Sequence, residues 1–291
     1  MTAILAVMAG RGGRNKAQIV LSANQANYVL NTAKVAGYQP NNTDVELVIN
    51  SGVYVSSNTT GGPALDVDTS WAAGDTVTIV NNGFVVGMGG AGGFGAAAST
   101  SYPDGNYNNT LSAANGAGGG LAFRAQRAVS VNNAGTIGGG GGGGGGAQAV
   151  TTGNFDGYSG NWGPGPLPLG GGGGGGGRTG TTNASGGKGG QSSLASAGYY
   201  KPGSAGGTGT ASAAGASGPG GVYSSTRGGN GGAGGGWGAA GASAVGAHNG
   251  NAYNVWTLHG SSMSGGSAGA AVSGNSNITW VATGTRLGAI A

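Results

Sequence analysis

The chain has 291 residues, of which 75 are glycine and 6% are charged; its formal net charge is +4 and it has no cysteine. This composition lies outside the range of ordinary globular domains. Collagen is excluded because there is no sustained Gly-X-Y register with abundant proline, and a disulfide framework or cysteine metal cluster is excluded by the lack of cysteine. Basic residues cluster only at Arg11, Arg14 and Lys16, which predicts a solvated basic surface and argues against a nucleic-acid partner.

The first segment, MTAILAVMAGRGGRNK, places its apolar residues before its positive charges. A secretory signal has the reverse order. No apolar run approaches the roughly 20 residues that a membrane helix needs. The sequence therefore predicts a soluble, non-secreted protein with no membrane insertion.

Residues 1–44 have the most conventional pattern. KAQIVL is compatible with a short strand, and NQANYVLNTAKVAGY with a short helix that ends near Gly37. The QPNN segment that follows is typical of a turn.

From Asp44 onward the apolar residues recur with period two. VELVIN, GVYVSS and DTVTIVNNGFVVG predict short strands separated by Asn/Gly turns. One unit then returns later in the chain, with its first apolar residue six positions before a glycine. The pairs are Val77 and Gly83, Val129 and Gly135, and Ile278 and Gly284. This recurrence predicts stacked coils that share one core.

The glycine-rich segments between these units have period three. In GMGGAGGFG the other residues are Met88, Ala91 and Phe94. Three residues per turn is the repeat of the polyproline II helix, which has no internal hydrogen bonds. Its buried N–H and C=O groups must pair with neighbouring helices. We predict that the all-glycine runs 138–146 and 170–177 lie in the middle of such a stack. The alternative is a flexible linker, which explains neither the period nor the similar segment lengths.

Ten glycine-rich legs are predicted in this part of the chain. They cover about 87–95, 116–120, 138–146, 170–177, 185–191, 204–209, 213–221, 228–236, 239–246 and 264–272. If successive legs alternate in direction, an even number must precede each return to the strand layer. Two precede 129–137 and ten precede 278–287, so the count closes. The predicted fold is irregular and all-β, with strands at one end of a polyglycine II sandwich and a C-terminal strand returning to them.

Five loops are then expected at the end away from the strands: 96–115, 147–169, 192–203, 222–227 and 247–263. They hold most aromatic residues of the glycine-rich region, which we predict to bind a receptor. These residues, with one histidine, are Tyr102, Tyr107, Phe155, Tyr158, Trp162, Tyr199, Tyr200, Tyr223, Tyr253, Trp256 and His259. Aromatic rings on adaptable Ser/Gly/Asn-rich loops resemble antibody paratopes. Alternatively, individual rings fold back and cap the end of the lattice.

The sequence contains no catalytic constellation. His248 and His259 do not have the spacing of a metal site. Asp66 and Asp68 would face one side of a strand, and we predict solvated strand residues, since calcium needs six or more oxygen ligands. No Gly-Lys-Ser/Thr follows the glycine runs, so they are not phosphate loops. The sequence predicts a protein that is not an enzyme and has no cofactor and no metal site.

The segments SANQANYVL, VELVINSGVYVSS, DTVTIVNNGFVVGMGGAGG and VSVNNAGTIGGGGGGGGG, in that order, resemble a known family. It is the receptor-recognising adhesin at the tip of the long tail fibre of T-even-type bacteriophages. The resemblance implies that an N-terminal region fixes one adhesin copy to a trimeric fibre protein. It also implies a sandwich of ten polyglycine II helices, whose distal loops bind a host outer-membrane protein or lipopolysaccharide. The start, MAGRGGRNK, departs from the aromatic-rich N-terminus of close relatives.

We therefore expect a viral adhesin located in the virion, at the distal tip of the tail fibre, that determines host range. Three regions are expected: residues 1–86 for fibre attachment, 87–274 for the glycine-rich sandwich with its loops, and 275–291 for the returning strand. One alternative is a polyglycine II ice-binding protein, which would need a flat face of regularly spaced small residues. Another is an insoluble Gly-rich structural protein, which would repeat one motif many times.

Overall fold

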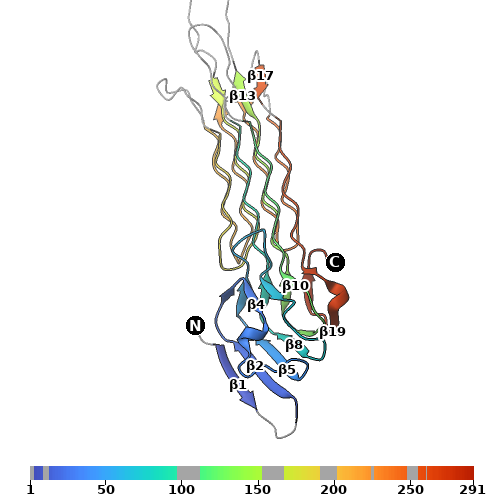
Figure 1. The fold of residues 1–291 in the computed structure, drawn as a ribbon. Helices are drawn as coiled ribbons and strands as arrows, with labels where there is room; N and C mark the ends of the chain where they lie inside the picture. The colour runs from blue at the N-terminus through green and yellow to red at the C-terminus, as the bar shows by residue number, and fades with distance from the viewer. Residues whose placement is uncertain are drawn as a thin grey trace, which may run out of the picture.

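A computed structural model describes residues 3–8, 13–96, 112–152, 167–190, 202–223, 226–247, 255–259 and 261–291. The molecule is elongated, with a body of short strands at one end and a bundle of extended rods that rise from it (Figure 1). Both chain ends lie at the strand body (Figure 1). The architecture is all-β and irregular, as the sequence predicts, and its two helices are single 3₁₀ turns within the described residues.

The strand body is a three-faced solenoid, in which each of the first four coils contributes one strand to each of three sheets. The first coil contains β2 (Asn15–Leu21), β3 (Gln25–Ala26) and β4 (Tyr28–Leu30), and the second β5 (Thr43–Ile49), β6 (Tyr54–Ser56) and β7 (Leu65–Val67). The third contains β8 (Thr76–Asn81), β9 (Phe84–Val86) and β10 (Phe123–Ala125), and the fourth β11 (Val129–Asn133), β12 (Thr136–Gly138) and β18 (Val272–Ser273). The last coil contains β19 (Ile278–Ala282) and β20 (Thr285–Leu287).

The three sheets run along the solenoid. Sheet A has the order β1-β2-β5-β8-β11-β19, where β1 is Ala3–Met8; sheet B is β20-β12-β9-β6-β3 and sheet C is β18-β10-β7-β4. Strands from successive coils pair in parallel, and β1 alone pairs antiparallel, with β2, among the described strands of these sheets. The sequence prediction of stacked coils is therefore confirmed.

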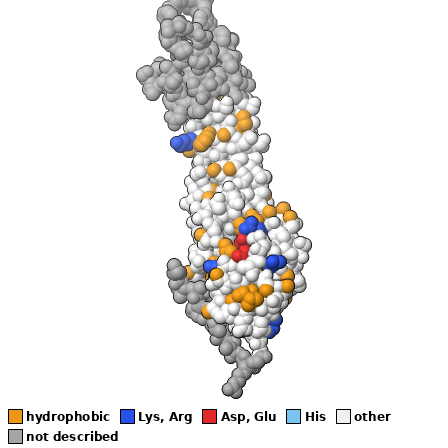
Figure 2. All heavy atoms as spheres, in the orientation of Figure 1, with side chains coloured by type: hydrophobic (Ala, Val, Ile, Leu, Met, Phe, Trp, Pro, Cys, Tyr) orange, Lys and Arg blue, Asp and Glu red, His pale blue; other side chains and the backbone are white. Residues whose placement is uncertain are grey.

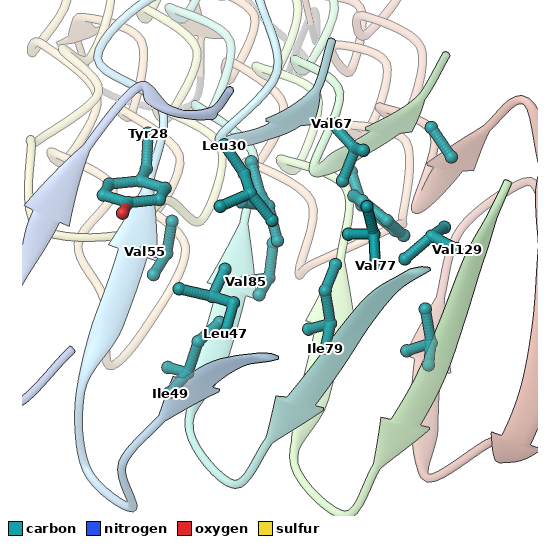
Figure 3. Close-up of a cluster of buried hydrophobic side chains, with 14 of the residues drawn as sticks. Tyr28, Leu30, Leu47, Ile49, Val55, Val67, Val77, Ile79, Val85 and Val129 are labelled. Carbon is teal, nitrogen blue, oxygen red and sulfur yellow. The ribbon is translucent and has the colours of Figure 1, made fainter. Parts of the chain in front are cut away.

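The core lies inside the solenoid and is built by alternation. In β5 every second residue is buried, and Leu47, Ile79 and Val131 occupy the same register position in three neighbouring coils. Figure 3 shows the resulting stack of Leu, Ile and Val side chains in the interior. Each strand buries every second residue. Because the strands of successive coils pair in the same register, the buried residue of one coil lies directly against the buried residue of the next.

The recurrent glycine marks the corner between sheets A and B. At this corner the buried Asn81 side chain donates to Asn133 Oδ1 (2.8 Å) and accepts from the N–H of Gly83 (3.1 Å), and Asn133 donates to the carbonyl of Thr283 (2.7 Å). A Cβ on Gly83 would overlap the carbonyl oxygen of Val53 in the coil below. Close stacking of corners is the physical reason why glycine recurs at this position in three coils, at Gly83, Gly135 and Gly284.

The predicted helix ending near Gly37 is wrong for most of its length. Gln25–Ala26 forms β3 and Tyr28–Leu30 forms β4, and only Thr32–Lys34 is helical, as a 3₁₀ turn. Tyr28 and Leu30 are buried and pair with β7. Burial in the shared core therefore outweighs the local pattern. The turn at QPNN is confirmed by a hydrogen bond from the N–H of Asn42 to the carbonyl of Gln39 (3.1 Å).

Asp66 is not the solvated residue that the sequence predicts. It is 6% exposed and forms an ion pair with Arg124 (2.6 Å), its partner in the register of β7 and β10. Gln126 also donates to Asp66, at 3.0 Å. The hydrogen bond to Asp66 raises the pKa of Arg124, although burial acts in the opposite direction. A buried charge such as that of Asp66 needs a partner of opposite charge, and Arg124 provides it. Asp68 is half-buried and accepts hydrogen bonds from Ser70.

The rods leave the solenoid at the corner between sheets B and C. Two rods join β9 to β10, and eight join β12 to β18 within the described chain. We name them R1 to R10 in chain order: 87–96, 113–121, 138–148, 170–179, 184–190, 203–210, 213–221, 228–236, 239–247 and 262–271. Successive rods are antiparallel. This alternation is the one that the sequence predicts, and it brings the chain back to the solenoid after R2 and after R10.

Hydrogen bonds between rods follow a period of three. In R3, the N–H groups of Gly143, Gly144 and Gly145 donate to R2, R4 and R9, at 2.9, 2.8 and 3.0 Å. The carbonyls of the same residues accept from R10, R1 and R8. R4 is bonded in the same way to R1, R8, R6, R5, R3 and R7. This connectivity is the one required of a lattice of helices with three residues per turn.

The bonding pattern arranges the rods in three layers: R2-R1-R5, R10-R3-R4-R6 and R9-R8-R7. Among the described rods only R3 and R4 have six bonded neighbours, and these rods contain the two all-glycine runs. Cβ atoms on Gly140, Gly141 and Gly142 would overlap carbonyl oxygens of R1, R8 and R10 respectively. In the outer rod R1, by contrast, Ala91 and Phe94 point to solvent. The number of neighbours thus decides where a side chain is tolerated.

Candidate functional site

The end of the rod bundle away from the solenoid carries two small sheets. β13 (Ala149–Thr152) continues R3, β14 (Leu167–Leu169) enters R4 and β17 (Val255–His259) precedes R10; they form an antiparallel sheet with β13 in the centre. β15 (Val222–Tyr223) and β16 (Thr226–Arg227) form a hairpin between R7 and R8. Figure 1 shows β13 and β17 at the end opposite the solenoid. Strands therefore form the stems of three predicted loops.

Most of the predicted receptor-binding residues lie outside the described residues. These are Tyr102, Tyr107, Phe155, Tyr158, Trp162, Tyr199, Tyr200 and Tyr253. The backbone of the other three is described. Tyr223 ends β15, and Trp256 and His259 belong to β17.

Trp256 lies at an irregularity in the distal sheet. Thr151 pairs with Thr257 and the next residue, Thr152, pairs with Val255, so Trp256 is an extra residue opposite this step. Such bulges re-aim side chains and are over-represented near functional sites. The sequence places Trp256 within a loop, and the structure instead places it in a bulged strand.

Amide side chains complete the hydrogen bonding where the rods end at the distal side. Asn115 accepts from the N–H of Ser264 (3.0 Å), Gln148 from Ala247 (3.3 Å) and Asn230 from Gly220 (3.0 Å). Each side-chain oxygen takes the place that a main-chain carbonyl takes within the lattice. Sequence reasoning missed these three residues, whose only signal is an amide at the end of a glycine-rich segment. They hold the bases of the loops in place.

Charge is unevenly distributed along the molecule. Among the described residues, the carboxylates all belong to the solenoid; they are Asp44, Glu46, Asp66, Asp68 and Asp75. Figure 2 shows charged side chains gathered there and sparse along the rods. Lys188 in R5 and Arg227 in β16 are exposed in the distal half. The described distal surface is therefore weakly positive, which favours an anionic partner.

A second candidate surface is the outer face of sheet A, which lies opposite the corner from which the rods leave. A hollow of about 360 Å³ on this face is lined by β2, β5 and β8. Its polar lining residues are Lys16, Gln18, Asp44, Glu46, Thr76 and Thr78. The alternation that buries one face of each strand leaves these side chains on the other.

Arg14 binds several coils together at the edge of this hollow. Its guanidinium donates to Asp44 (2.7 Å) and to the carbonyls of Asn41, Thr43 and Gly74. Arg14 is therefore not part of a merely solvated basic surface, contrary to the sequence prediction.

These contacts change the pKa of Asp44. Burial acts to raise this pKa. Hydrogen bonds from Arg14 and Thr76, together with the charges of Arg14 and Lys16, outweigh burial and lower it.

The lowered pKa predicts that this contact contributes to stability in a pH-dependent way. The contribution is fully present above the pKa of the carboxyl in the unfolded chain, about 3.9, and is lost as the pH falls through the lower folded-state value. Arg14→Met should therefore reduce Tm more at pH 6 than at pH 2. Both side chains are about one third exposed, so we expect the pH-dependent part to stay below about 1 kcal/mol.

The matched control for this experiment is Arg127→Met, because Arg127 donates to the carbonyl of Thr69. Its effect on Tm, measured by circular dichroism, should be the same at both pH values. An Arg14→Met effect that does not depend on pH would contradict the role assigned to Asp44.

In the described part of the chain, no group of three or more His, Cys, Asp or Glu residues could hold a metal ion. No helix in that part is long and apolar enough to cross a membrane.

The described residues define a stem of hydrogen-bonded rods with a strand solenoid at one end and two small sheets at the other. The chain belongs to the phage tail fibre adhesin Gp38 family, whose model matches residues 16–291. No curated protein matches the chain. Among solved structures it is similar to the crystal structure of the gp37–gp38 adhesin tip complex of the bacteriophage S16 long tail fiber. The identity is 23% and the TM-score 0.49, over 92% of this chain and 82% of that one.

Proposed function

We propose that this phage tail fibre adhesin binds a host outer-membrane receptor, a protein or lipopolysaccharide, through the loops at its distal end, and that this binding determines host range. It acts without catalysis and without a cofactor. The observation that carries the proposal is the alternation of ten antiparallel rods among the described residues, which brings five chain segments to one end. Family membership supports the adhesive role.

The rods act as a stiff support for these loops. We take them to be polyglycine II helices, because their bonds repeat every three residues and link each central rod to six others. A loop held by a rigid base loses less freedom on binding, which leaves more of the contact energy as affinity. Tyr and Trp residues on the loops are the proposed anchors, since aromatic residues dominate the energetics of binding surfaces.

The opposite end of the molecule attaches to a trimeric tail-fibre protein. We assign attachment to residues 1–86, the sandwich with its loops to 87–274 and the returning strand to 275–291. The outer face of sheet A supports this assignment, because it lies on the far side of the solenoid from the rods and contains a polar hollow. In the similar solved structure, gp38 stands in a complex with gp37.

Competition at the cell surface tests this function. Purified chain in excess should slow adsorption of a phage that carries it, by occupying the receptor. The chain should also retain a component of outer-membrane extracts of that host, and parallel incubations with purified lipopolysaccharide and with outer-membrane protein in liposomes distinguish the two receptor classes. The control is a chain in which a short Gly/Ser segment replaces residues 153–166. It should compete less well than the unchanged chain. Unchanged adsorption at saturating concentrations of folded chain would contradict the proposal.

A further inference from the structure

One tryptophan lies where the rods meet the solenoid. Trp237 occupies the tight turn between R8 and R9, next to Gly238, whose φ is +64°. It is 9% exposed. The turn itself is fixed to R3, because the N–H of Gly238 donates to the carbonyl of Gly139 at 2.7 Å.

The indole of Trp237 contacts the solenoid on one side. Its ring centroid lies 5.9 Å from that of Phe84 and 6.5 Å from that of Tyr54. Phe84 and Tyr54 are register partners in β9 and β6 and stack at 4.5 Å. Since the next residue of each strand, Val85 or Val55, is buried in the core, the two rings belong to the outer face of sheet B.

The same indole contacts the central rods on the other side. Its N–H donates to the carbonyl of Thr179 at the end of R4 (3.0 Å), and the guanidinium of Arg178 lies 3.7 Å from the ring centroid. Arg178 also donates to the carbonyl of Ala211 (3.0 Å), in the turn between R6 and R7. One side chain therefore connects sheet B with the ends of R4, R8 and R9, and through Arg178 with the turn between R6 and R7.

We propose that Trp237 is a positioning residue that holds the rod bundle at a fixed angle to the solenoid. The ring has aromatic contacts to the solenoid and cation–π and hydrogen-bonding contacts to the rods, so it resists rotation of one body against the other about several axes. With the function proposed above, this joint fixes the direction in which the distal loops point relative to the attached fibre. The joint itself does not depend on that function.

Distance measurement between spin labels tests the joint. The chain contains no cysteine, so labels can be placed at Thr279→Cys on the solenoid and Ala216→Cys on R7, both exposed. Double electron–electron resonance should give a narrow distance distribution. Trp237→Ala should broaden it by about twofold, because the rods then keep their chain connections and hydrogen bonds to the solenoid but lose the ring that resists rotation. Trp237→Phe should largely restore the narrow distribution, because it retains a ring against Phe84.

Trp71→Ala is the matched control. Trp71 is also buried, donates to a backbone carbonyl (Leu30, 3.2 Å) and packs edge-on against Tyr38, but within the solenoid. It should lower Tm without broadening the distribution. If Trp237→Ala does not fold, Phe84→Thr removes the solenoid side of the contact; threonine stands at the same register position in the next coil, as Thr136. It should also broaden the distribution.

An unchanged distribution in both joint variants, or equal broadening in Trp71→Ala, would overturn the proposal. The consequence for adhesion is measured separately. Phage carrying Trp237→Ala should adsorb more slowly, while the isolated variant chain binds the receptor with wild-type affinity. Wild-type adsorption together with a broadened distribution would contradict the link between the joint and adhesion, and a wild-type chain that binds no receptor would contradict the proposed function alone.

Discussion

Alanine at Gly174 will destabilise the protein by about 3 kcal/mol, whereas alanine at Gly236 will leave its stability unchanged or raise it slightly. Gly174 lies in R4, and its Cβ would overlap the carbonyl of Gly144 in R3. Backbone cannot move aside as a flexible side chain can, so we expect the upper end of the range for overpacking. At Gly236 a Cβ meets no atom within 4 Å.

The matched comparison lies within one rod. Gly234 and Gly236 are both in R8, but a Cβ on Gly234 would overlap the carbonyl of Gly176 in R4. Gly234→Ala should therefore behave like Gly174→Ala, two residues from a substitution that is tolerated. Urea unfolding followed by circular dichroism measures all three variants. Equal free energies of unfolding for the two R8 variants would mean that the rods are not packed as described.

Removing the ring of Trp256 will weaken binding of the adhesin to host cells by about 30-fold while leaving the fold intact. This loss corresponds to a binding hot spot of about 2 kcal/mol. The bulged position of Trp256 between Val255 and Thr257, at the distal end, motivates the prediction. Trp162→Ala, in the segment between β13 and β14, should have a similar effect on adsorption.

Adsorption kinetics of phage carrying Trp256→Ala, together with the Tm of the purified chain, measure this prediction. Val281→Ala is the control, because Val281 is 67% exposed on β19 in the solenoid and its substitution should leave adsorption unchanged. Wild-type adsorption by both Trp256→Ala and Trp162→Ala would refute the assignment of these loops to the receptor.

The features that the sequence predicts well share a physical origin in repetition. The glycine pattern of a rod depends on how many rods surround it, because a side chain is tolerated only where no neighbour lies. The all-glycine runs 138–146 and 170–177 accordingly fall in the two rods with six neighbours. The recurrent glycine after a strand marks the corner where one coil packs against the next and leaves no room for a Cβ. In both cases a steric rule acts at every repeat, so the pattern is visible without knowledge of the fold.

The features that the sequence misses depend on single contacts between distant segments. Tyr28 and Leu30 form a strand because β7 pairs with them, and Asp66 is buried because Arg124 occupies the adjacent position in β10. From the sequence, Trp237 is a single aromatic residue in a short turn. No neighbouring residue in the sequence indicates that Phe84 and Arg178 are its partners. For the candidate site, the sequence predicts the alternation of the rods, which the hydrogen bonds confirm, but not the strands β13 to β17 at their distal end.

Amide hydrogen exchange tests most directly whether main chain alone can hold this scaffold together. The N–H groups of residues 140–146 and 171–177 each donate to a neighbouring rod, and Gly139 donates to Leu287 in β20. The all-glycine runs 138–146 and 170–177 should therefore exchange only through global unfolding and rank among the slowest amides of the chain. Exchange of these glycines at the rate of an unstructured peptide in the intact protein would contradict the account.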